Sequence, residues 1–281
     1  MSLQLFNNIT QDFSKKVTKS YSTSFSLGIS LLSKDIQKDI YAVYAYVRFA
    51  DEIVDTFHEY DKETLLNDFI VQTYKALNEK ISLNPVLHQF QITINNYQID
   101  KNLIDTFLSS MRMDLNLTTC TREAYEEYII GSAEVVGLIC LQIFLKGDKK
   151  RYADLSPYAR RLGAAFQKIN FLRDLQADYS GLGRRYFPQW KPDSAFDENI
   201  KSEILDEIKE DFKIARQGIC KLPSNSKLGV YAAYVYYKAL LLKIMRTPSE
   251  KLMNTRIRIN NYTKLALLIF ASMRIKLKQV E

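Results

Sequence analysis

Glycine and proline are scarce in this chain, and their scarcity limits the folds that are open to it. The 281 residues include 9 Gly and 6 Pro, about 5% together, where average usage gives roughly 12%. Tight turns depend on these two residues, so a chain this poor in them has few turns. The composition therefore argues against a sandwich, a barrel or a doubly wound α/β fold. It favours long helices with short connections.

Hydrophobic periodicity and helix start signals predict an all-α protein. No stretch alternates with period two for long enough to indicate a strand, and no repeat or linker is found, so we predict one domain over residues 1–281. Ser156-Pro157 predicts a helix start, because proline suits the first helical position. The predicted helices cover residues 35–57, 61–77, 85–97, 101–113, 121–145, 157–179, 199–222, 226–245 and 261–278.

Cysteine and histidine are too few for several kinds of site. Cys120, Cys140 and Cys220 are widely spaced, which fits a reducing cytosol and neither a disulfide framework nor a zinc site. Two histidines, His58 and His88, exclude a multi-histidine metal centre and give little support to Ser-His-Asp or Cys-His catalysis. A hard-cation site built from carboxylates stays open.

Apolar stretches and charge bear on location and partners. No signal peptide is expected, and the longest apolar stretches, residues 135–145 and 265–273, fall short of the ~20 residues that span a bilayer. We expect a cytoplasmic protein, at most peripheral at the inner face of the membrane. Residues 212–281 hold 14 Lys and Arg against 2 Asp and Glu, a net charge of +12, which forms either a solvated face or one that meets anionic headgroups. No motif supports binding of nucleic acid.

An acidic face is predicted on the helix that contains residues 44–55. Tyr44, Arg48, Asp51 and Asp55 fall within about 60° of one another at 100° per residue. Two carboxylates at i and i+4 repel by roughly 0.2–0.5 kcal/mol, and a divalent cation would turn that repulsion into chelation. The alternative is a solvated acidic face with Arg48 as its local partner.

A second polar stripe is predicted farther along the chain, with aromatic and small apolar residues on both sides. It consists of Gln167, Asn170, Asp174 and Asp178. Such a stripe is typical of a pocket lining, since burying an amide and two carboxylates is costly unless hydrogen bonds, cations or a metal ion satisfy them. The alternative is an inward polar network that other side chains satisfy.

The two stripes are more specific as a pair. Asp51 and Asp174 are 123 positions apart, and helix faces so separated can meet across a helical bundle. Oxygen ligands from opposed helices suit Mg²⁺, which keeps several waters and often bridges to substrate phosphates. The sequence has neither a Walker motif nor GxGxxG, so we infer a diphosphate held through a metal ion rather than a nucleotide-binding loop.

Five segments match the motifs of one enzyme family. The most specific is AFQKINFLRDLQADYSGLGRRYFP at residues 165–188, which contains NxLRDxxxD followed by RxYxP. The others are Ser20–Phe25, YAVYAYVRFADEIVD at residues 41–55, Met113-Asp114 and Tyr128–Gly137. On these segments, which span nearly the whole chain, the sequence resembles the squalene/phytoene synthases, most of all bacterial phytoene synthases. The resemblance implies an all-α, single-domain isoprenoid synthase bundle with a central apolar cavity.

The resemblance also implies a role for each matching residue. Mg²⁺, with Mn²⁺ as a substitute, would be held by Asp51, Asp55, Asn170, Asp174 and Asp178. Contacts to diphosphate, or to the acidic residues, would come from Arg48, Arg173 and Arg184. The residues that would bind substrate are Ser20, Ser22, Phe25 and Tyr236. Those that would shape the cavity or stabilise cations are Tyr44, Tyr128, Gln167 and Tyr186.

The implied reaction belongs to carotenoid biosynthesis. Two prenyl diphosphates, each geranylgeranyl diphosphate, would condense head to head through a cyclopropyl diphosphate to give phytoene and diphosphate. No nucleotide cofactor is expected for it. Two alternatives stay open: a squalene, hydroxysqualene or dehydrosqualene synthase that uses farnesyl diphosphate, and a non-catalytic lipid-binding or assembly protein of this fold. A class I terpene cyclase, acting on one substrate, is a third.

The sequence departs from the family pattern in three places. Glu134 stands where a small residue is usual, and we expect its carboxylate to pair with a basic side chain. Lys19 stands where some members have histidine, and the spacer between Asp178 and Arg184 is one residue longer than expected. None of these departures removes a predicted metal ligand.

Overall fold

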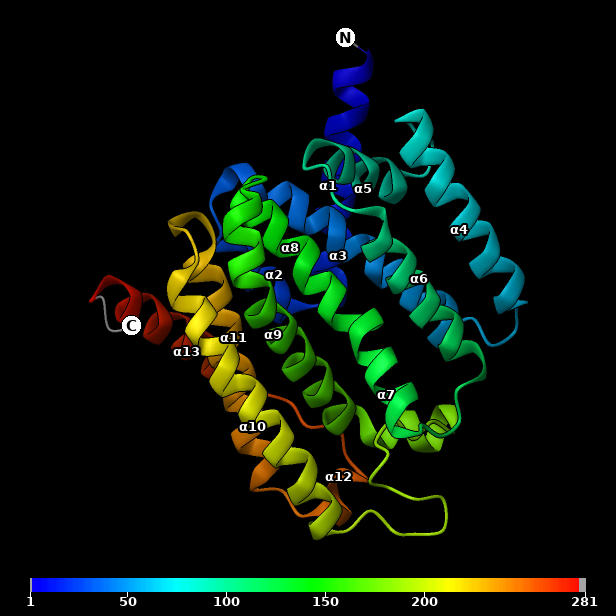
Figure 1. The fold of residues 1–281 in the computed structure, drawn as a ribbon, viewed down its shortest axis with the longest axis vertical. Helices are drawn as coiled ribbons and strands as arrows, with labels where there is room; N and C mark the ends of the chain where they lie inside the picture. Colours follow the sequence, from blue (N-terminus) through cyan, green and yellow to red (C-terminus); the bar gives the residue numbers. More distant parts are fainter. Residues whose placement is uncertain (1, 278–281) are drawn as a thin grey trace.

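The structure is a computed structural model that describes residues 2–277, and helices make up most of it (Figure 1). The helices are α1 (Ser2–Tyr21), α2 (Thr23–Ser30), α3 (Lys34–Asp55), α4 (Lys62–Glu79), α5 (Pro85–Asn96), α6 (Lys101–Asn116), α7 (Arg122–Ile129), α8 (Val135–Leu145), α9 (Lys149–Gln176), α10 (Glu198–Lys221), α11 (Ser224–Met245), α12 (Ser249–Leu252) and α13 (Asn261–Lys276). Two π-helical segments, η1 (Ile130–Glu134) and η2 (Ala177–Gly181), follow α7 and α9. Within residues 2–277, strand pairing is limited to one isolated bridge between Thr119 and Arg185. The prediction of an all-α protein is confirmed.

Two hydrophobic clusters hold the helices together. One lies mainly among α1, α3, α4, α5, α6 and α8, where Tyr46 stacks on Phe90 with ring centroids 3.6 Å apart. The other lies mainly among α7, α9, α10 and α11 and includes Ile169, Phe187 and Ile208. The polar stripe of α9 therefore runs along a helix whose other faces are packed. One domain over residues 1–281 stays a prediction.

Most predicted helix starts are confirmed by side-chain caps. Asp61 accepts a hydrogen bond from the Thr64 N–H at 3.1 Å, and Asn84 accepts one from the Val86 N–H at 3.0 Å. At α3 the capping position is Ser33, and Asp35 lies in the first turn. The last predicted helix extends to Lys278, which lies outside the described residues.

The predicted start at Ser156-Pro157 is wrong. The helix α9 begins at Lys149, because Asp148 caps it by accepting a hydrogen bond from the Arg151 N–H at 3.1 Å. Pro157 lies inside the helix, and the Ser156 hydroxyl donates to the Tyr152 carbonyl one turn back at 2.6 Å. Asp148, eight residues before Ser156, is thus the true start signal, and the helix accommodates proline in its interior.

The first two helices were not predicted at all. The buried residues of α1 are Thr10, Ser14, Val17 and Thr18. Ser14 and Thr18 each donate a hydroxyl hydrogen bond to a carbonyl four residues earlier, at 3.3 and 3.0 Å, and so satisfy their own polarity. The apolar residues Phe6, Phe13 and Val17 recur at helical spacing, so the sequence carried a helix signal that was missed, although hydroxyl residues fill much of the buried face.

Two helical stretches are long and apolar enough, by length and composition, to cross a membrane: Arg122–Leu145 and Ser224–Met245. The first joins α7, η1 and α8, so its apolar run is longer than residues 135–145 alone. Of the most apolar window in each stretch, 56% and 50% is buried inside the bundle. Burial of this kind is typical of core helices, and it accounts for their apolar character.

The second polar stripe is positioned by a close approach of α9 to η1. A Cβ at Gly163 would lie 2.5 Å from the Ala133 carbonyl oxygen, closer than atoms pack. Glycine is therefore required there, and the two backbones touch one turn before the polar stripe of α9 begins. The same junction confirms the pairing expected for Glu134, which contacts Arg160 of α9 at 3.1 Å.

Candidate active site

The two polar stripes predicted from the sequence face each other in the structure. Tyr44, Arg48, Asp51 and Asp55 lie on the second half of α3, and Gln167, Asn170 and Asp174 lie on α9, with Asp178 in η2. Burial, together with the nearby carboxylates of Asp174 and Asp55, raises the pKa of Asp178 to about 8. Because Asp55 belongs to α3 and Asp178 to η2, the two stripes lie within electrostatic reach of each other.

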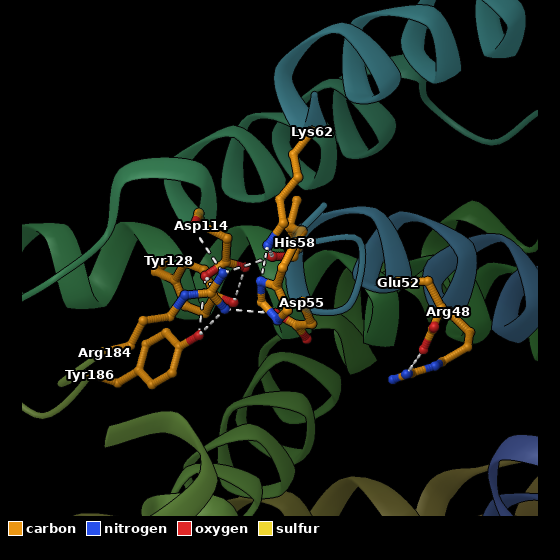
Figure 2. A network of polar contacts seen from close by, with 10 residues as sticks. Arg48, Glu52, Asp55, His58, Lys62, Asp114, Tyr128, Arg184 and Tyr186 are labelled. Carbon is orange, nitrogen blue, oxygen red and sulfur yellow. Dashed lines mark hydrogen bonds and ion pairs between the residues drawn. The ribbon is translucent and has the colours of Figure 1, made fainter. Parts of the chain in front are cut away.

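Arg184 joins the two stripes. Its guanidinium lies 2.6 Å from the Asp55 carboxylate and donates to the backbone carbonyls of Val54 at 3.1 Å and Asp114 at 2.9 Å. The side chain is almost fully buried, and Figure 2 shows it between Asp55 of α3 and Asp114 of α6. A buried arginine with several acceptors is held in one position, so the loop after η2 is fixed against α3. The resemblance implied that Arg184 holds the acidic residues, and its contacts fit that role.

Asp114 is a buried carboxylate for which sequence reasoning gave no role. It accepts hydrogen bonds from the hydroxyls of Tyr128 at 2.6 Å and Tyr186 at 3.1 Å (Figure 2). Burial raises the pKa of Asp114 to about 6, although the positive charge of Arg184 opposes the shift. The Tyr186 ring stacks on Phe171 with centroids 3.9 Å apart. The network therefore fixes two predicted site tyrosines, and its only sequence signal was the Met113-Asp114 pair.

The carboxylates of the site carry more negative charge than their surroundings offset. Burial raises the pKa of Asp51 to about 7, with Asp55 adding to the effect and Arg48 opposing it. Near neutral pH the charged forms of Asp51 and Asp178 are therefore disfavoured, and added positive charge would stabilise them. Carboxylate and amide oxygens are hard ligands, so the donor set fits Mg²⁺.

The carboxylates do not gather into one closed metal cage. Among residues 2–277, no three Asp, Glu, His or Cys side chains lie close enough together to hold an ion. Mg²⁺ commonly takes one or two carboxylates and completes its shell with water and substrate phosphates. An open arrangement with acidic groups on two helices is consistent with ions held jointly by protein and a diphosphate. The metal ligands stay a prediction.

Two arginines neutralise Asp174. Arg173 donates two hydrogen bonds to its carboxylate, at 3.0 and 2.5 Å, and the Arg256 Nε lies 2.7 Å from the same group. Arg256 belongs to the segment between α12 and α13, in the basic region for which a solvated face was one interpretation. Arg256 is exposed, as that interpretation requires, and its charge also meets a carboxylate of the second stripe.

Arg48 offers an unpaired donor near the first stripe. Figure 2 shows its side chain directed toward Glu52, one turn along α3, and away from the Arg184 cluster. Its guanidinium also lies over the Tyr21 ring, 4.5 Å from the centroid. The buried Nε has no hydrogen-bond partner in the part of the chain that the structure describes. An anionic ligand would supply the missing acceptor.

The residues predicted to bind substrate are only partly brought together. Ser22 caps α2 by accepting from the Phe25 N–H at 3.1 Å, and the Phe25 ring lies 5.6 Å from Tyr44. Ser20 is exposed near the end of α1. Tyr236 faces an apolar hollow between α2, α11 and α13.

Tyr237, next to Tyr236, is a second site residue to which the sequence assigned no role of its own. Its hydroxyl donates to the Asn170 side chain at 3.1 Å, and its ring stacks on Phe166 with centroids 3.9 Å apart. Asn170 in turn donates to Gln167 at 3.4 Å. Together with Phe25, 6.0 Å from Tyr237, these rings form an aromatic wall beside the polar stripe of α9. The sequence signal was a cluster of four tyrosines in α11, Tyr231, Tyr234, Tyr236 and Tyr237, which fits either helix packing or a cavity wall and does not say which ring faces the stripe.

The match to a known family covers most of the chain. The profile described as squalene/phytoene synthase matches residues 18–263. The chain belongs to this family. Every site residue described above lies within the matched range.

Comparison with individual proteins shows how far the similarity extends. The chain is 27% identical over 262 residues to the chloroplastic phytoene synthase of Daucus carota. This match covers 83% of this chain and 63% of that protein. It is 28% identical over 178 residues to a phytoene synthase of Mycobacterium bovis, covering 62% of this chain and 56% of the relative. The matches thus span only 56% to 63% of these relatives' own length.

A solved structure confirms the fold. The crystal structure of a dehydrosqualene synthase in complex with ligand superposes with a TM-score of 0.81 at 22% identity. The superposition covers 96% of this chain and 98% of the other. The isoprenoid synthase bundle implied by the family resemblance is therefore the fold of this protein.

Proposed function

We propose that the chain catalyses head-to-head condensation of two prenyl diphosphates, with geranylgeranyl diphosphate as substrate and phytoene as product. The observation that carries the proposal is the link between the two acidic stripes: the Arg184 backbone N–H donates to the Asp178 carbonyl at 2.9 Å, and the Arg184 guanidinium lies 2.6 Å from the Asp55 carboxylate. Such a site suits a polyanionic leaving group that is bound through cations. The curated relatives named as phytoene synthases support this choice of substrate.

Each part of the site has a task in this reaction. Mg²⁺, held by the five predicted ligands of the two stripes, would supply the positive charge that lets diphosphate leave. The unpaired Nε of Arg48 would donate to a diphosphate oxygen. Departure of diphosphate leaves an allylic cation, which the double bond of the second substrate attacks; the resulting cation loses one proton as the ring closes to the cyclopropyl diphosphate. That intermediate would lose its diphosphate, rearrange and release a second proton to give the linear product.

The aromatic wall beside the stripe protects and stabilises the cations. Phe25, Tyr44, Phe166 and Tyr237 present ring faces or edges within contact distance of one another. Ring faces stabilise a nearby cation by about 0.5–2 kcal/mol each. A packed wall also keeps water from quenching the cation. Tyr128 and Tyr186, tied to buried Asp114, keep the far side of the site in place.

The farnesyl diphosphate alternative is favoured by one observation, the overlap with a dehydrosqualene synthase structure over nearly all of both chains. Incubation of the purified chain with each prenyl diphosphate and Mg²⁺, followed by lipid extraction and mass analysis, separates the two. We expect a forty-carbon product from geranylgeranyl diphosphate. A thirty-carbon product alone would replace phytoene synthesis with the farnesyl reaction.

Variants of the two stripes test the assignment of the site. Asp51→Ala and Asp174→Ala are each expected to lower product formation at least about a hundred-fold, since positioned charge at a leaving group contributes on that scale. Asp68→Ala, on the exposed face of α4, is the matched control. Full activity of both stripe variants would contradict the site. Absence of product from every substrate would favour a non-catalytic protein, and a cyclic product from one substrate would favour a cyclase.

A further inference from the structure

The outer face of α13 is apolar and exposed. Four residues spaced three or four apart, and therefore on one face, are exposed by 55% to 89% of their surface: Tyr262, Leu265, Ile269 and Met273. Phe270, at the edge of that face, is 46% exposed. We call these five residues the α13 outer face. Figure 1 shows α13 at the edge of the molecule beside α11, on the opposite side from α4.

The inner face of the same helix is apolar as well. Ala271 is buried, and Leu267, Leu268 and Ile275 pack against the second hydrophobic cluster. The inner face therefore accounts for the attachment of α13 to the bundle, and the outer face has no such role. Apolar side chains on both the inner and the outer face are unusual for a surface helix whose outer side meets only water.

The surroundings of the outer face are strongly basic. Residues 251–280 contain 7 Lys and Arg and no Asp or Glu. Exposed basic side chains flank α13 at both ends, with Arg258 before it and Lys276 in its last turn. Beside its start, the end of α11 adds exposed Leu242 and Met245 together with Lys243, next to a hollow lined by both helices. Apolar and basic groups thus share one side of the molecule.

We propose that the α13 outer face docks on an anionic phospholipid bilayer, with its apolar side chains at the acyl boundary and its basic side chains at the headgroups. The helix has 16 residues, fewer than the ~20 needed to span a bilayer, so it lies along the surface. Charge decides between a lipid surface and a second copy of the chain. A two-fold interface would place the same basic patch against itself, with no acidic residues among residues 251–280 to offset it. Anionic headgroups supply the complementary charge.

The test measures binding of the full chain to vesicles by co-sedimentation, without any prenyl substrate, so it does not depend on the proposed function. We expect binding to vesicles of phosphatidylglycerol and phosphatidylcholine, little binding to phosphatidylcholine alone, and weaker binding as salt is raised. The double variant Ile269→Ser and Met273→Ser is expected to weaken vesicle affinity by about ten-fold or more, since each side chain loses its apolar burial. Both positions are exposed, so the midpoint of thermal unfolding should not move.

The matched control changes two exposed apolar residues on another helix, Leu5→Ser with Ile9→Ser on α1. It is expected to bind vesicles like the unchanged chain. A second variant, Arg258→Glu with Lys276→Glu, should lose affinity for anionic vesicles and leave the low affinity for phosphatidylcholine unchanged. The proposal is overturned by equal losses in the α1 and α13 variants. It is also overturned if the chain does not bind vesicles and instead forms a dimer that is lost in the double variant Ile269→Ser and Met273→Ser.

Discussion

The guanidinium of Arg184 lies 2.6 Å from the carboxylate of Asp55, although 129 positions separate the two residues. The same side chain binds the carbonyls of Val54 and Asp114, so one buried cation connects α3, α6 and the loop after η2. Removing it would leave the Asp114 carboxylate buried with less positive charge nearby. The stability of the site should therefore depend on this one residue.

Replacing Arg184 by Met is expected to lower the free energy of unfolding by about 3 kcal/mol or more, because breaking a buried pair leaves an uncompensated charge. Urea denaturation at neutral pH measures the change. Arg122→Met is the control, since Arg122 pairs with Glu207 at the surface and should cost at most about 1 kcal/mol. Arg184→Lys, which keeps the charge and loses the fork of hydrogen bonds, should fall between them. Equal stability of the two Met variants would show that the Arg184 contacts contribute little.

The raised pKa values of Asp178 and Asp51, about 8 and 7 against an ordinary 3.8, set the pH dependence of stability without metal. Between about pH 4 and pH 8 the folded protein holds protons that the unfolded chain has released, so the free energy of unfolding falls as pH rises through this range. Asp178→Asn should make the slope shallower and raise stability at pH 8. Asp68→Asn, at an exposed position of α4, should leave the slope unchanged. Thermal unfolding across this pH range checks both, and identical slopes for the two variants would refute the expectation.

Binding of Mg²⁺ together with inorganic diphosphate should release protons at pH 7. The reason is that Asp51 and Asp178 carry part of a proton in the free protein and must give it up to act as ligands. Calorimetric titration in two buffers of different ionisation enthalpy measures the number released. Diphosphate without Mg²⁺ should bind at least about ten-fold more weakly. Asp51→Asn should bind with less proton release. Release that does not change in this variant would place the titrating group elsewhere.

Gly163→Ala should destabilise the protein by about 1–3 kcal/mol, because the added Cβ would lie 2.5 Å from the Ala133 carbonyl and force α9 away from η1. Gly181→Ala is a matched control near the other end of the motif, where a Cβ meets nothing within 4 Å. It should be neutral or stabilising by up to about 1 kcal/mol. Denaturant unfolding compares the two. A Gly163 variant as stable as the Gly181 variant would mean that the helix junction adapts freely.

Several features could be predicted from the sequence because they depend on neighbours a few positions away. Scarce glycine and proline determined an all-helical chain, and the spacing of Asp51 and Asp55, and of Asn170, Asp174 and Asp178, placed each set on one helix face. The caps at Asp61 and Asn84 marked helix starts correctly. Helix faces and helix starts can be predicted from sequence because helix periodicity and capping act within one or two turns.

The tertiary structure decided which faces meet. Asp114 gained its role from Tyr128 and Tyr186, which lie 14 and 72 positions away, and Arg256 reached Asp174 across 82 positions. The helix α1 was missed although Phe6, Phe13 and Val17 recur at helical spacing; hydroxyl groups bonded to their own backbone fill much of its buried face. Periodicity tells which side of a helix differs from the others, and only packing in three dimensions fixes what that side touches. The chemistry of the stripes was therefore readable from the sequence, and the residues that hold them in place were not.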